Sequence, residues 1–460
     1  MKTSQLSLLS KSIFLVAVAQ CLAAAEERPV DWDAVPAILA RIQPPTFPDR
    51  VYPVTDFGAV ADGSTDNTAA IRRAIEACHR AGGGRVLVSG GVFLTGAIHL
   101  ESHVELHVAE GATLKFDPDP EKYLPVVQTR FEGTELMNFS PLIYAFEKEN
   151  IAITGGGTLD GSASETTWWS LHRKKPGSSV DPRASYDRLT GMGDRGVPVE
   201  ERVFGAGHVL RPSFVQPFRC RRVLIEGVRI INSPMWVIHP VYSRNVTVRG
   251  VSVVSHGPNN DGCNPDSSED VLIENCLFDT GDDCIAVKSG KNADGRRVGL
   301  PSQNIIIRGC EMRDGHGGVV LGSEVSGGVR NVFAENCRMD SPNLDRALRL
   351  KTNPQRGGLI ENIFMRDVQV GRVAHSVLTL DLVYWGVSTG DFPPLVRNVR
   401  MERVTSESSP RVLSIVGSAD ARVEDVRVID CVFRGVEGAD ELVHTGDILL
   451  SNVHLEPVKK

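Results

Sequence analysis

A short pattern of alternating apolar residues recurs along the second half of the chain. Each copy places apolar residues at every second position and then a polar pair that usually contains Gly, Asn or Asp. The copies occupy residues 222–228, 245–251, 270–276, 304–310, 331–337, 362–368, 398–404 and 425–431. Such alternation is typical of a half-buried strand, and these turn residues tolerate left-handed backbone angles. Each copy therefore predicts a strand, a turn and a second short strand.

The spacing of the copies indicates how they are assembled. Their first apolar residues are separated by 23, 25, 34, 27, 31, 36 and 27 residues. A helical repeat would instead place apolar residues three and four apart. A constant strand with variable spacing is typical of a right-handed parallel β-helix, in which coils stack and loops absorb insertions. Residues 103–108 and 150–155 fit as earlier coils.

Stacking also fixes the domain count. One coil cannot bury its own inward face, so all coils share a single core. We therefore predict one all-β domain over residues 51–460, although length alone would allow two or three domains. This domain would be the catalytic one if the chemistry described below is correct.

Three segments depart from the strand pattern. Ile71, Ala74, Ile75 and Cys78 lie on one face of a predicted helix that begins after the capping candidates at 64–66, and this helix would cover the open N-terminal end of the solenoid. Residues 26–50 are Pro-rich and predict an extended lead-in. Residues 162–215 and 291–302 are long and polar, which is typical of loops that shape a binding face.

The first 25 residues resemble an export signal. Lys2 and Lys11 precede or flank a short apolar stretch at 13–19, and small residues lead up to a cut before Glu26. A lipid anchor on Cys21 is the alternative, which the neighbouring Gln20 disfavours. We expect an exported protein, periplasmic or extracellular, because no later segment resembles a membrane span.

Charge limits the partners of the mature chain. Without Lys2 and Lys11, 48 basic residues face 57 acidic ones, a net charge of −9. This balance argues against a nucleic-acid partner. It also means that an acidic ligand must be held by local cations rather than by the overall field.

Eight of the nine cysteines follow the leader, and an even number in an exported chain permits disulfides. However, Cys276, Cys310, Cys337 and Cys431 occupy the same position in four copies of the repeat. Stacked, buried thiols explain this recurrence better than disulfides do, although pairing stays open.

Acidic residues cluster where strands should end. Asp261 and Asp282 are 21 residues apart, close to one coil, so we expect them on neighbouring rungs about 4.8 Å apart. Asp283 follows directly and could face the same cleft. Gathering three carboxylates raises at least one pKa, which favours a function over a merely solvated turn.

Cations and an imidazole follow these acids. His316 is flanked by Gly315 and Gly317, which would permit close approach of the backbone to a substrate. Arg349 and Lys351 are two residues apart and so share one face of a strand. Such a pair suits a carboxylate ligand, because arginine binds it bidentately and lysine adds a compact charge.

Together these motifs resemble the polygalacturonases of glycoside hydrolase family 28. The family's Asn-Thr-Asp, Gly-Asp-Asp, Gly-His-Gly and Arg-Ile-Lys motifs correspond to residues 259–261, 281–283, 315–317 and 349–351, with Asn260 in place of the usual threonine. The similarity extends from about Val54 to beyond Tyr384.

The resemblance implies roles for individual residues. Asp282 would be the general acid, and Asp261 and Asp283 would activate water in an inverting reaction, for which the carboxyls stand about 6.5–9.5 Å apart. His316 would tune the proton on the acid. Asn259, Arg349, Lys351 and Tyr384 would contact the substrate, with Trp385 as a rival to the tyrosine.

The resemblance also implies an activity. We expect hydrolysis of the α-1,4-galacturonosyl links of pectin, polygalacturonate or their oligomers, by a monomer without cofactor or metal. Exo action is favoured because the two long loops could close one end of the cleft. A hydrolase of rhamnogalacturonan or another decorated pectin is the nearest alternative. A calcium-dependent pectate lyase and a non-catalytic carbohydrate-binding β-helix are alternatives of other classes.

Overall fold

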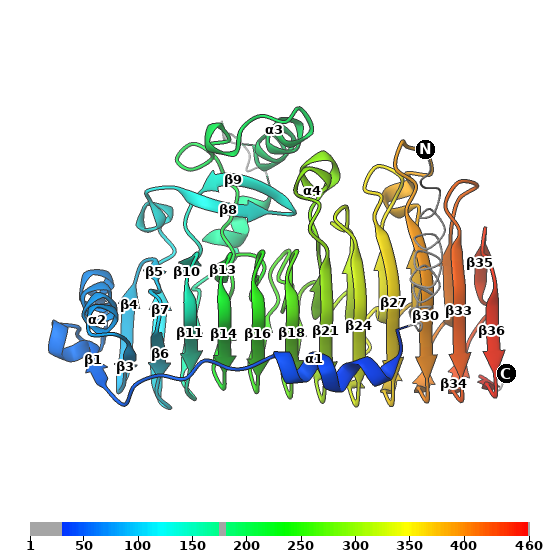
Figure 1. Cartoon of the computed structure of the whole chain (residues 1–460), viewed down its shortest axis with the longest axis horizontal. Coiled ribbons are helices and arrows are strands. Elements are labelled where there is room, and N and C mark those ends of the chain that lie inside the picture. The colour runs from blue at the N-terminus through cyan, green and yellow to red at the C-terminus, as the bar shows by residue number, and fades with distance from the viewer. Residues whose placement is uncertain (1–29, 174–180, 459–460) are drawn as a thin grey trace, which may run out of the picture.

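The computed structural model describes residues 30–173 and 181–458. It is a right-handed parallel β-helix whose coils stack along the long axis of the molecule (Figure 1). The predicted fold class is confirmed. The predicted export signal at residues 1–25, with the alternative anchor at Cys21, lies outside the described residues.

The first face of the solenoid is a sheet of 13 parallel strands. In spatial order they are β1 (Val51–Pro53), β3 (Gly84–Val88), β6 (Val104–Val108), β11 (Glu149–Thr154), β14 (Arg221–Glu226), β16 (Arg244–Arg249), β18 (Glu269–Glu274), β21 (Ser302–Arg308), β24 (Val329–Glu335), β27 (Leu359–Arg366), β30 (Leu395–Glu402), β33 (Val423–Ile429) and β36 (Ile448–Ser451).

The second face is another sheet of 13 strands, each formed by the short strand that follows a turn. They are β2 (Asp62–Asp66), β4 (Gly91–Thr95), β7 (Ala112–Phe116), β12 (Thr158–Asp160), β15 (Arg229–Ile231), β17 (Ser252–Ser255), β19 (Leu277–Thr280), β22 (Glu311–Met312), β25 (Arg338–Met339), β28 (Gln369–Arg372), β31 (Thr405–Ser408), β34 (Val432–Val436) and β37 (His454–Pro457).

The third face consists of two shorter sheets, joined by single bridges through Ile238 and Cys263. One contains β5 (Ile98–His99), β10 (Ile143–Phe146) and β13 (Val215–Phe218). The other contains β20 (Ile285–Val287), β23 (Val319–Gly322), β26 (Arg346–Lys351), β29 (Ser376–Asp381), β32 (Arg411–Val416) and β35 (Glu441–Val443).

A corner near the start of the first-face strands explains the Asn or Asp that begins most copies of the repeat. Asn304, Asn331 and Asn362 have φ values of 58°, 58° and 60°, a region that few non-glycine residues other than Asn and Asp visit. Their side chains form a ladder, in which the amide of Asn331 donates to Asn304 at 3.0 Å and that of Asn362 donates to Asn331 at 2.9 Å. The repeat therefore sets both the turn and the register.

The cysteines that follow the leader are all free and buried. The expectation of buried thiols at 276, 310, 337 and 431 is confirmed. These residues belong to the single large apolar core that runs through the coils.

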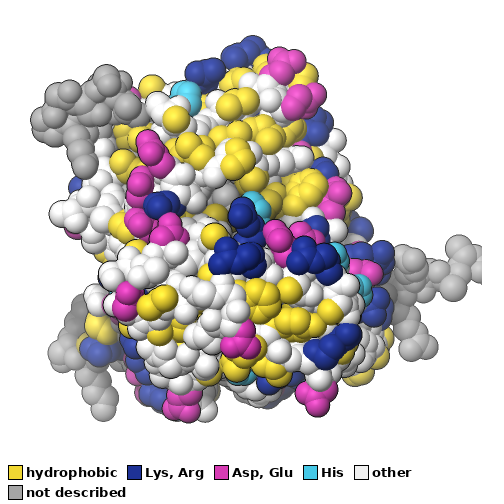
Figure 2. Space-filling view, turned by 90° about the vertical axis from the view of Figure 1, so that its left-hand side faces the viewer, with side chains coloured by type: hydrophobic (Ala, Val, Ile, Leu, Met, Phe, Trp, Pro, Cys, Tyr) yellow, Lys and Arg dark blue, Asp and Glu magenta, His cyan; other side chains and the backbone are white. Residues whose placement is uncertain are grey.

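The predicted N-terminal cap is α2 (Thr68–Arg80), which buries Ile71, Ala74, Ile75 and Cys78. It packs on β1 and β3 and covers the first coil (Figure 1). Figure 2 looks onto this end, where charged side chains of both signs are interspersed with hydrophobic ones. The Asp66 carboxylate accepts a hydrogen bond from the Thr68 amide at 2.9 Å, as a cap would.

The lead-in at 26–50 was expected to be extended, and this prediction is wrong for part of it. A 3₁₀ helix, η1 (Trp32–Ala34), and α1 (Val35–Arg41) interrupt it. Val35, Ile38 and Ile42 pack on outward-facing apolar residues of the first face, which are Leu272, Ile306, Phe333 and Phe364. The helix forms because it covers this apolar stripe, which crosses four neighbouring coils (Figure 1).

Insertions form a crown over the third face (Figure 1). It comprises the antiparallel hairpin of β8 (Val127–Phe131) and β9 (Thr134–Asn138), together with α3 (Pro182–Asp194) and α4 (Asn292–Val298). The further 3₁₀ helices are η2 (Val54–Phe57), η3 (Pro120–Tyr123), η4 (Trp168–His172), η5 (Val199–Glu201) and η6 (Tyr384–Gly386). Among the described residues, none of the helices is sufficiently long and apolar to cross a membrane.

Candidate active site

A cavity of about 910 Å³ lies between the crown and the third face. All eight residues predicted from the sequence line it, namely Asn259, Asp261, Asp282, Asp283, His316, Arg349, Lys351 and Tyr384. Parts of the chain that are more than 100 residues apart in the sequence therefore meet at one place.

The pairing of the strands differs from expectation by one residue. Cys263 pairs with Ile285 across neighbouring coils, and the Gly262 amide donates to the Asp283 carbonyl at 3.0 Å. Asp261 is therefore opposite Asp283, not Asp282. Asp282 lies one position earlier, in the bend after β19, and still lines the cavity.

The three carboxylates differ in their access to the cavity. The side chains of Asp261 and Asp283 are 3% and 1% exposed, whereas that of Asp282 is 19% exposed. Asp282 is thus the acid that a bound molecule can reach most readily. The other two form the floor.

Asp261 carries the raised pKa that gathered acids require. Burial, reinforced by the charge of Asp282, raises its pKa to about 8. The Asn264 amide donates to its Oδ2 at 2.8 Å, and Lys288 Nζ lies 3.5 Å away. The amide holds the side chain in place, and the raised pKa favours the protonated carboxyl.

Asp282 forms a pair with His316. His316 Nδ1 lies 3.0 Å from Asp282 Oδ1, and the His316 amide donates to the Asp282 carbonyl at 3.1 Å. Burial opposes the charge on Asp282, but the hydrogen bond to His316 and the charge of Lys351 outweigh it and lower the pKa of Asp282. The same hydrogen bond raises the pKa of His316. Both shifts favour a carboxylate on Asp282 and an imidazolium on His316.

The glycine before His316 serves the coil rather than a substrate. A Cβ on Gly315, whose φ is 153°, would lie 2.7 Å from the Asp282 carbonyl oxygen. Only glycine permits this approach of two coils. This close packing brings His316 to Asp282, and the expectation that the flanking glycines admit a substrate stays a prediction.

The two cations lie on one face of β26, as expected, and meet Asp283. Lys351 Nζ is 2.7 Å from Asp283 Oδ2, and Arg349 Nη1 is 3.6 Å from Asp283 Oδ1. Both cationic groups also lie within 6 Å of the Tyr384 ring. Part of their charge therefore neutralises Asp283, and the remainder faces the cavity.

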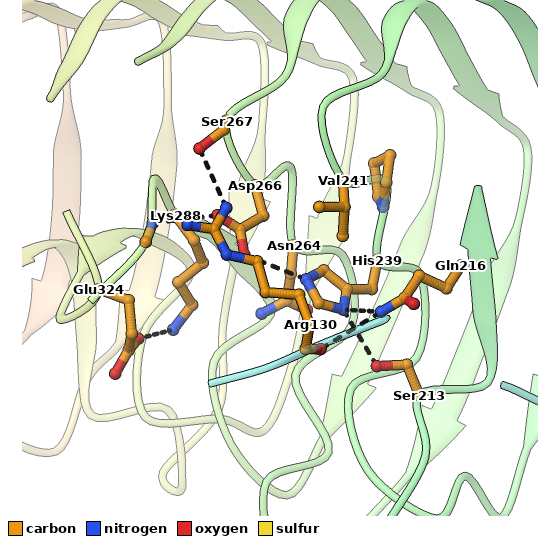
Figure 3. Close-up of polar contacts among 12 residues, drawn as sticks. Arg130, Ser213, Gln216, His239, Val241, Asn264, Asp266, Ser267, Lys288 and Glu324 are labelled. Atoms are coloured by element: carbon orange, nitrogen blue, oxygen red, sulfur yellow. Dashed lines mark hydrogen bonds and ion pairs between the residues drawn. The ribbon is translucent and has the colours of Figure 1, made fainter. Parts of the chain in front are cut away.

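A buried ionic network, of which Lys288 and Glu324 also line the cavity, was not predicted from the sequence. Lys288 Nζ lies 3.1 Å from Glu324 Oε2, and the pair raises the pKa of Lys288 against its burial (Figure 3). Next to it, Arg130 Nη1 donates to Asp266 Oδ1 at 2.8 Å, with both side chains fully buried. Lys288 directly follows the apolar strand β20 (Ile285–Val287). A charged residue at the end of an apolar strand was the signal in the sequence that could have indicated this network.

Arg211 is a second residue that the sequence did not reveal. Its Nη1 donates to the Pro234 and Pro258 carbonyls, and its Nη2 donates to Asn259 Oδ1 at 2.8 Å. It thereby fixes Asn259, which has a φ of 56°. Burial lowers the pKa of Arg211 to about 10, and no acidic group among the described residues forms an ion pair with it.

The acids of the floor are not arranged as metal ligands. Within residues 30–173 and 181–458, one trio of acidic, histidine or cysteine side chains brings its ligand atoms within 4.8 Å of one another, and it is His256, Asp279 and Asp314. None of these lines the cavity. A calcium site would require several converging oxygens, so the carboxylate arrangement suits proton transfer better.

Residues 206–442 match the family described as Glycosyl hydrolases family 28. The chain is 30% identical over 351 residues to a probable polygalacturonase of Vitis vinifera, covering 74% of this chain and 62% of the relative. It is 30% identical over 354 residues to an exo-poly-alpha-D-galacturonosidase of Dickeya chrysanthemi, covering 73% and 57%. The chain thus matches about six tenths of the length of these two relatives.

Among solved structures, the chain is similar to a hyperthermoactive exopolygalacturonase from Thermotoga maritima. The two are 48% identical with a TM-score of 0.89, over 92% of this chain and 96% of the other.

Proposed function

The chain belongs to family 28 of the glycosyl hydrolases, and from that premise we propose that it hydrolyses α-1,4-galacturonosyl links of polygalacturonate or its oligomers. One observation carries the proposal: a single cavity is lined by three aspartates, a histidine and the cations of β26. The acids suit glycosidic hydrolysis, and the cations suit a substrate with a carboxylate on each sugar.

Asp282 is the general acid. It is the most exposed of the three aspartates and has the partner that can supply a proton, His316 at 3.0 Å. A bound sugar displaces water, which makes a separated imidazolium and carboxylate more costly. Transfer of the proton from His316 Nδ1 to Asp282 removes both charges, and the acid is then ready to protonate the glycosidic oxygen.

Asp283 and Asp261 act on the attacking water from the opposite side. Asp283 is held beside Lys351, and we assign it as the base. Asp261, with its raised pKa, carries a proton and orients the water by a hydrogen bond. This division refines the expectation that both aspartates activate water equally. The reaction inverts the anomeric centre, because water attacks directly.

The cut is made near a chain end. The crown covers one side of the cavity, which supports a cut near a chain end. Relatives described as an exo-poly-alpha-D-galacturonosidase and an exopolygalacturonase support exo action. We further propose export of a monomer to the periplasm or beyond, after loss of residues 1–25.

Time-resolved product analysis tests the activity. On polygalacturonate, we expect monomer or dimer from the first time points, with no unsaturated, ultraviolet-absorbing product and no loss of activity with a chelator. A ladder of oligomers would refute exo action. Unsaturated products would identify a lyase. If no sugar were released from polygalacturonate, the substrate would instead be a decorated pectin such as rhamnogalacturonan.

A further inference from the structure

Two charged side chains of the cavity lining, Glu132 and Arg356, lack the direct ionic partners that their neighbours have. Glu132 lies in the turn of the β8–β9 hairpin and lines the cavity. Arg356 follows β26, is 8% exposed, and lines the same cavity. Neither belongs to the motifs that predicted the catalytic centre.

The hairpin holds Glu132 in a fixed place. Phe131 pairs with Thr134, so the loop consists of Glu132 and Gly133, with φ values of 41° and 77°. Asn-Gly or Asp-Gly suits such a turn better, so the turn itself does not require a glutamate. The Lys291 amide donates to the Gly133 carbonyl at 2.9 Å, and Arg130, two residues earlier, is bound to Asp266 (Figure 3).

The other acids of this region are already paired. Glu324 is bound to Lys288, Asp266 to Arg130, and Asp294 to Arg202 at 2.8 Å. The carboxyl of Glu132 makes no hydrogen bond or ion pair with another residue in the described part of the chain. A carboxyl that is half-buried, fixed and unpaired in a cavity is suited to a ligand.

Arg356 is the cationic counterpart. Its Nη1 donates to Asn292 Oδ1 at 2.7 Å, while its Nε is buried without a partner. It forms no ion pair within residues 30–173 and 181–458. The charge of Glu324 acts on Arg356 without a direct ion pair. An anionic ligand in the cavity would give the buried guanidinium a direct partner.

Glu132 and Arg356 share a neighbour, Tyr186. The charges of Glu132 and Arg356 both influence the pKa of Tyr186, a residue of α3 that also lines the cavity. We propose that Glu132 and Arg356 form the binding site for the terminal uronate of the substrate, with Arg356 bound to its carboxylate and Glu132 hydrogen-bonded to its hydroxyls. This inference rests on the proposed function and names residues that determine chain-end specificity.

The protonation of Glu132 is consistent with this role. Burial raises its pKa, and the nearby charge of Glu324 adds to the effect against the opposing charge of Lys291. The raised pKa favours the protonated carboxyl, which both donates and accepts a hydrogen bond. That form also avoids repulsion of a uronate.

Titration calorimetry with galacturonate and with neutral galactose separates the two roles. For the wild type we expect tighter binding of galacturonate. Arg356→Gln should reduce galacturonate affinity at least about tenfold and abolish the preference over galactose, while Arg356→Lys restores part of it. Glu132→Ala should weaken both sugars by a similar factor, and Glu201→Gln, an exposed acid outside the cavity, should change neither.

Kinetics on trigalacturonate give an independent measure. Loss of uniform binding raises KM with little change in kcat, so we expect KM of Glu132→Ala to rise about tenfold while the melting temperature is unchanged. If Glu132→Ala unfolds, Glu132→Gln replaces it. Unaltered affinity in both Arg356→Gln and Glu132→Ala, or no galacturonate binding by the wild type, overturns the inference. Absence of any cleavage of polygalacturonate with binding intact would refute only the proposed function.

Discussion

Two parts of the cavity lining are built differently, and we call the lining under the crown the closed end and the lining at η6 the open end. The crown is fixed by buried charge pairs, such as Arg202 with Asp294 at 2.8 Å, and by an apolar cluster of its own that includes Phe204 and Leu189. The 3₁₀ helix η6, in contrast, presents Trp385 with 77% of its surface exposed. One part is packed and the other is an exposed surface.

This contrast teaches how a solenoid acquires a chain-end preference. The coils alone form a face that is open at both ends. Insertions between strands then close one end, at the cost of burying charges that must be paired. Under the proposed function, the aspartates on the coils would carry the chemistry and the crown would select the chain end, so the two tasks would belong to separate parts of the molecule.

The largest expected effect is that of Asp282→Asn, at the boundary between the two ends. Loss of the general acid should lower kcat by about 10³–10⁴-fold, equally for polygalacturonate and trigalacturonate, because both substrates present the same bond. Initial rates of product release measure this, with thermal unfolding as the control for folding. Near-normal rates, or a loss limited to one chain length, would contradict the acid assignment.

Arg130→Met tests whether the closed end depends on its anchor. Asp266 would be left buried without its cation, which should lower the free energy of unfolding by about 3–5 kcal/mol and loosen the hairpin enough to release longer products. Urea unfolding and product analysis measure both. The matched control is Arg434→Met, a surface pair with Glu407 at 3.0 Å, for which we expect less than about 1 kcal/mol. If both variants lowered the free energy of unfolding equally, the buried ion pair would be no more important to stability than the exposed one.

Asp261→Asn tests whether burial of Asp261 in the floor of the cavity raises its pKa. In the folded chain the pKa of Asp261 is raised from 3.8 to about 8, so between these values the folded state binds a proton that the unfolded state has lost. Wild-type stability should therefore fall as pH rises through this window, by up to about 1.4 kcal/mol per pH unit. The variant should lose this contribution, as urea unfolding at several pH values would reveal. If the free energies of unfolding of the wild type and the variant changed with pH in parallel, the raised pKa of Asp261 would be contradicted.

The smallest expected effect is that of Trp385→Ala at the open end. The ring is exposed, so stability should not change, whereas a lost aromatic contact with a sugar costs about 1 kcal/mol. We expect KM for polygalacturonate to rise about fivefold, with little change for digalacturonate, which is too short to reach it. A similar rise for both substrates would place the ring in the closed-end site instead.

The repeat and the catalytic motifs could be predicted from the sequence because both are local. Alternating residues identify strands wherever they occur, and the Asn or Asp that begins most copies of the repeat marks the same corner of those coils. The motif residues then follow from their positions on successive coils, and all eight line the cavity. The exact pairing, Asp261 with Asp283, was missed by one residue because turn length cannot be inferred from the period of alternation.

The crown and the lead-in could not be predicted in the same way. The helix α1 forms where Ile38 meets Phe333 and Phe364, which are far away in the sequence. The pairing of Arg130 with Asp266 spans 136 residues. No local pattern identifies such partners, because each charge is acceptable only where the other is buried beside it.

The sequence by itself thus determined the β-helix, its cap and the acids that line its third face, since these depend on periodicity and on residue type. Only the tertiary structure decided which aspartate holds the proton, which cations remain available, and which end of the cavity is closed. Those properties arise from burial and from charges brought together by the coils, and burial is not a property of any segment alone.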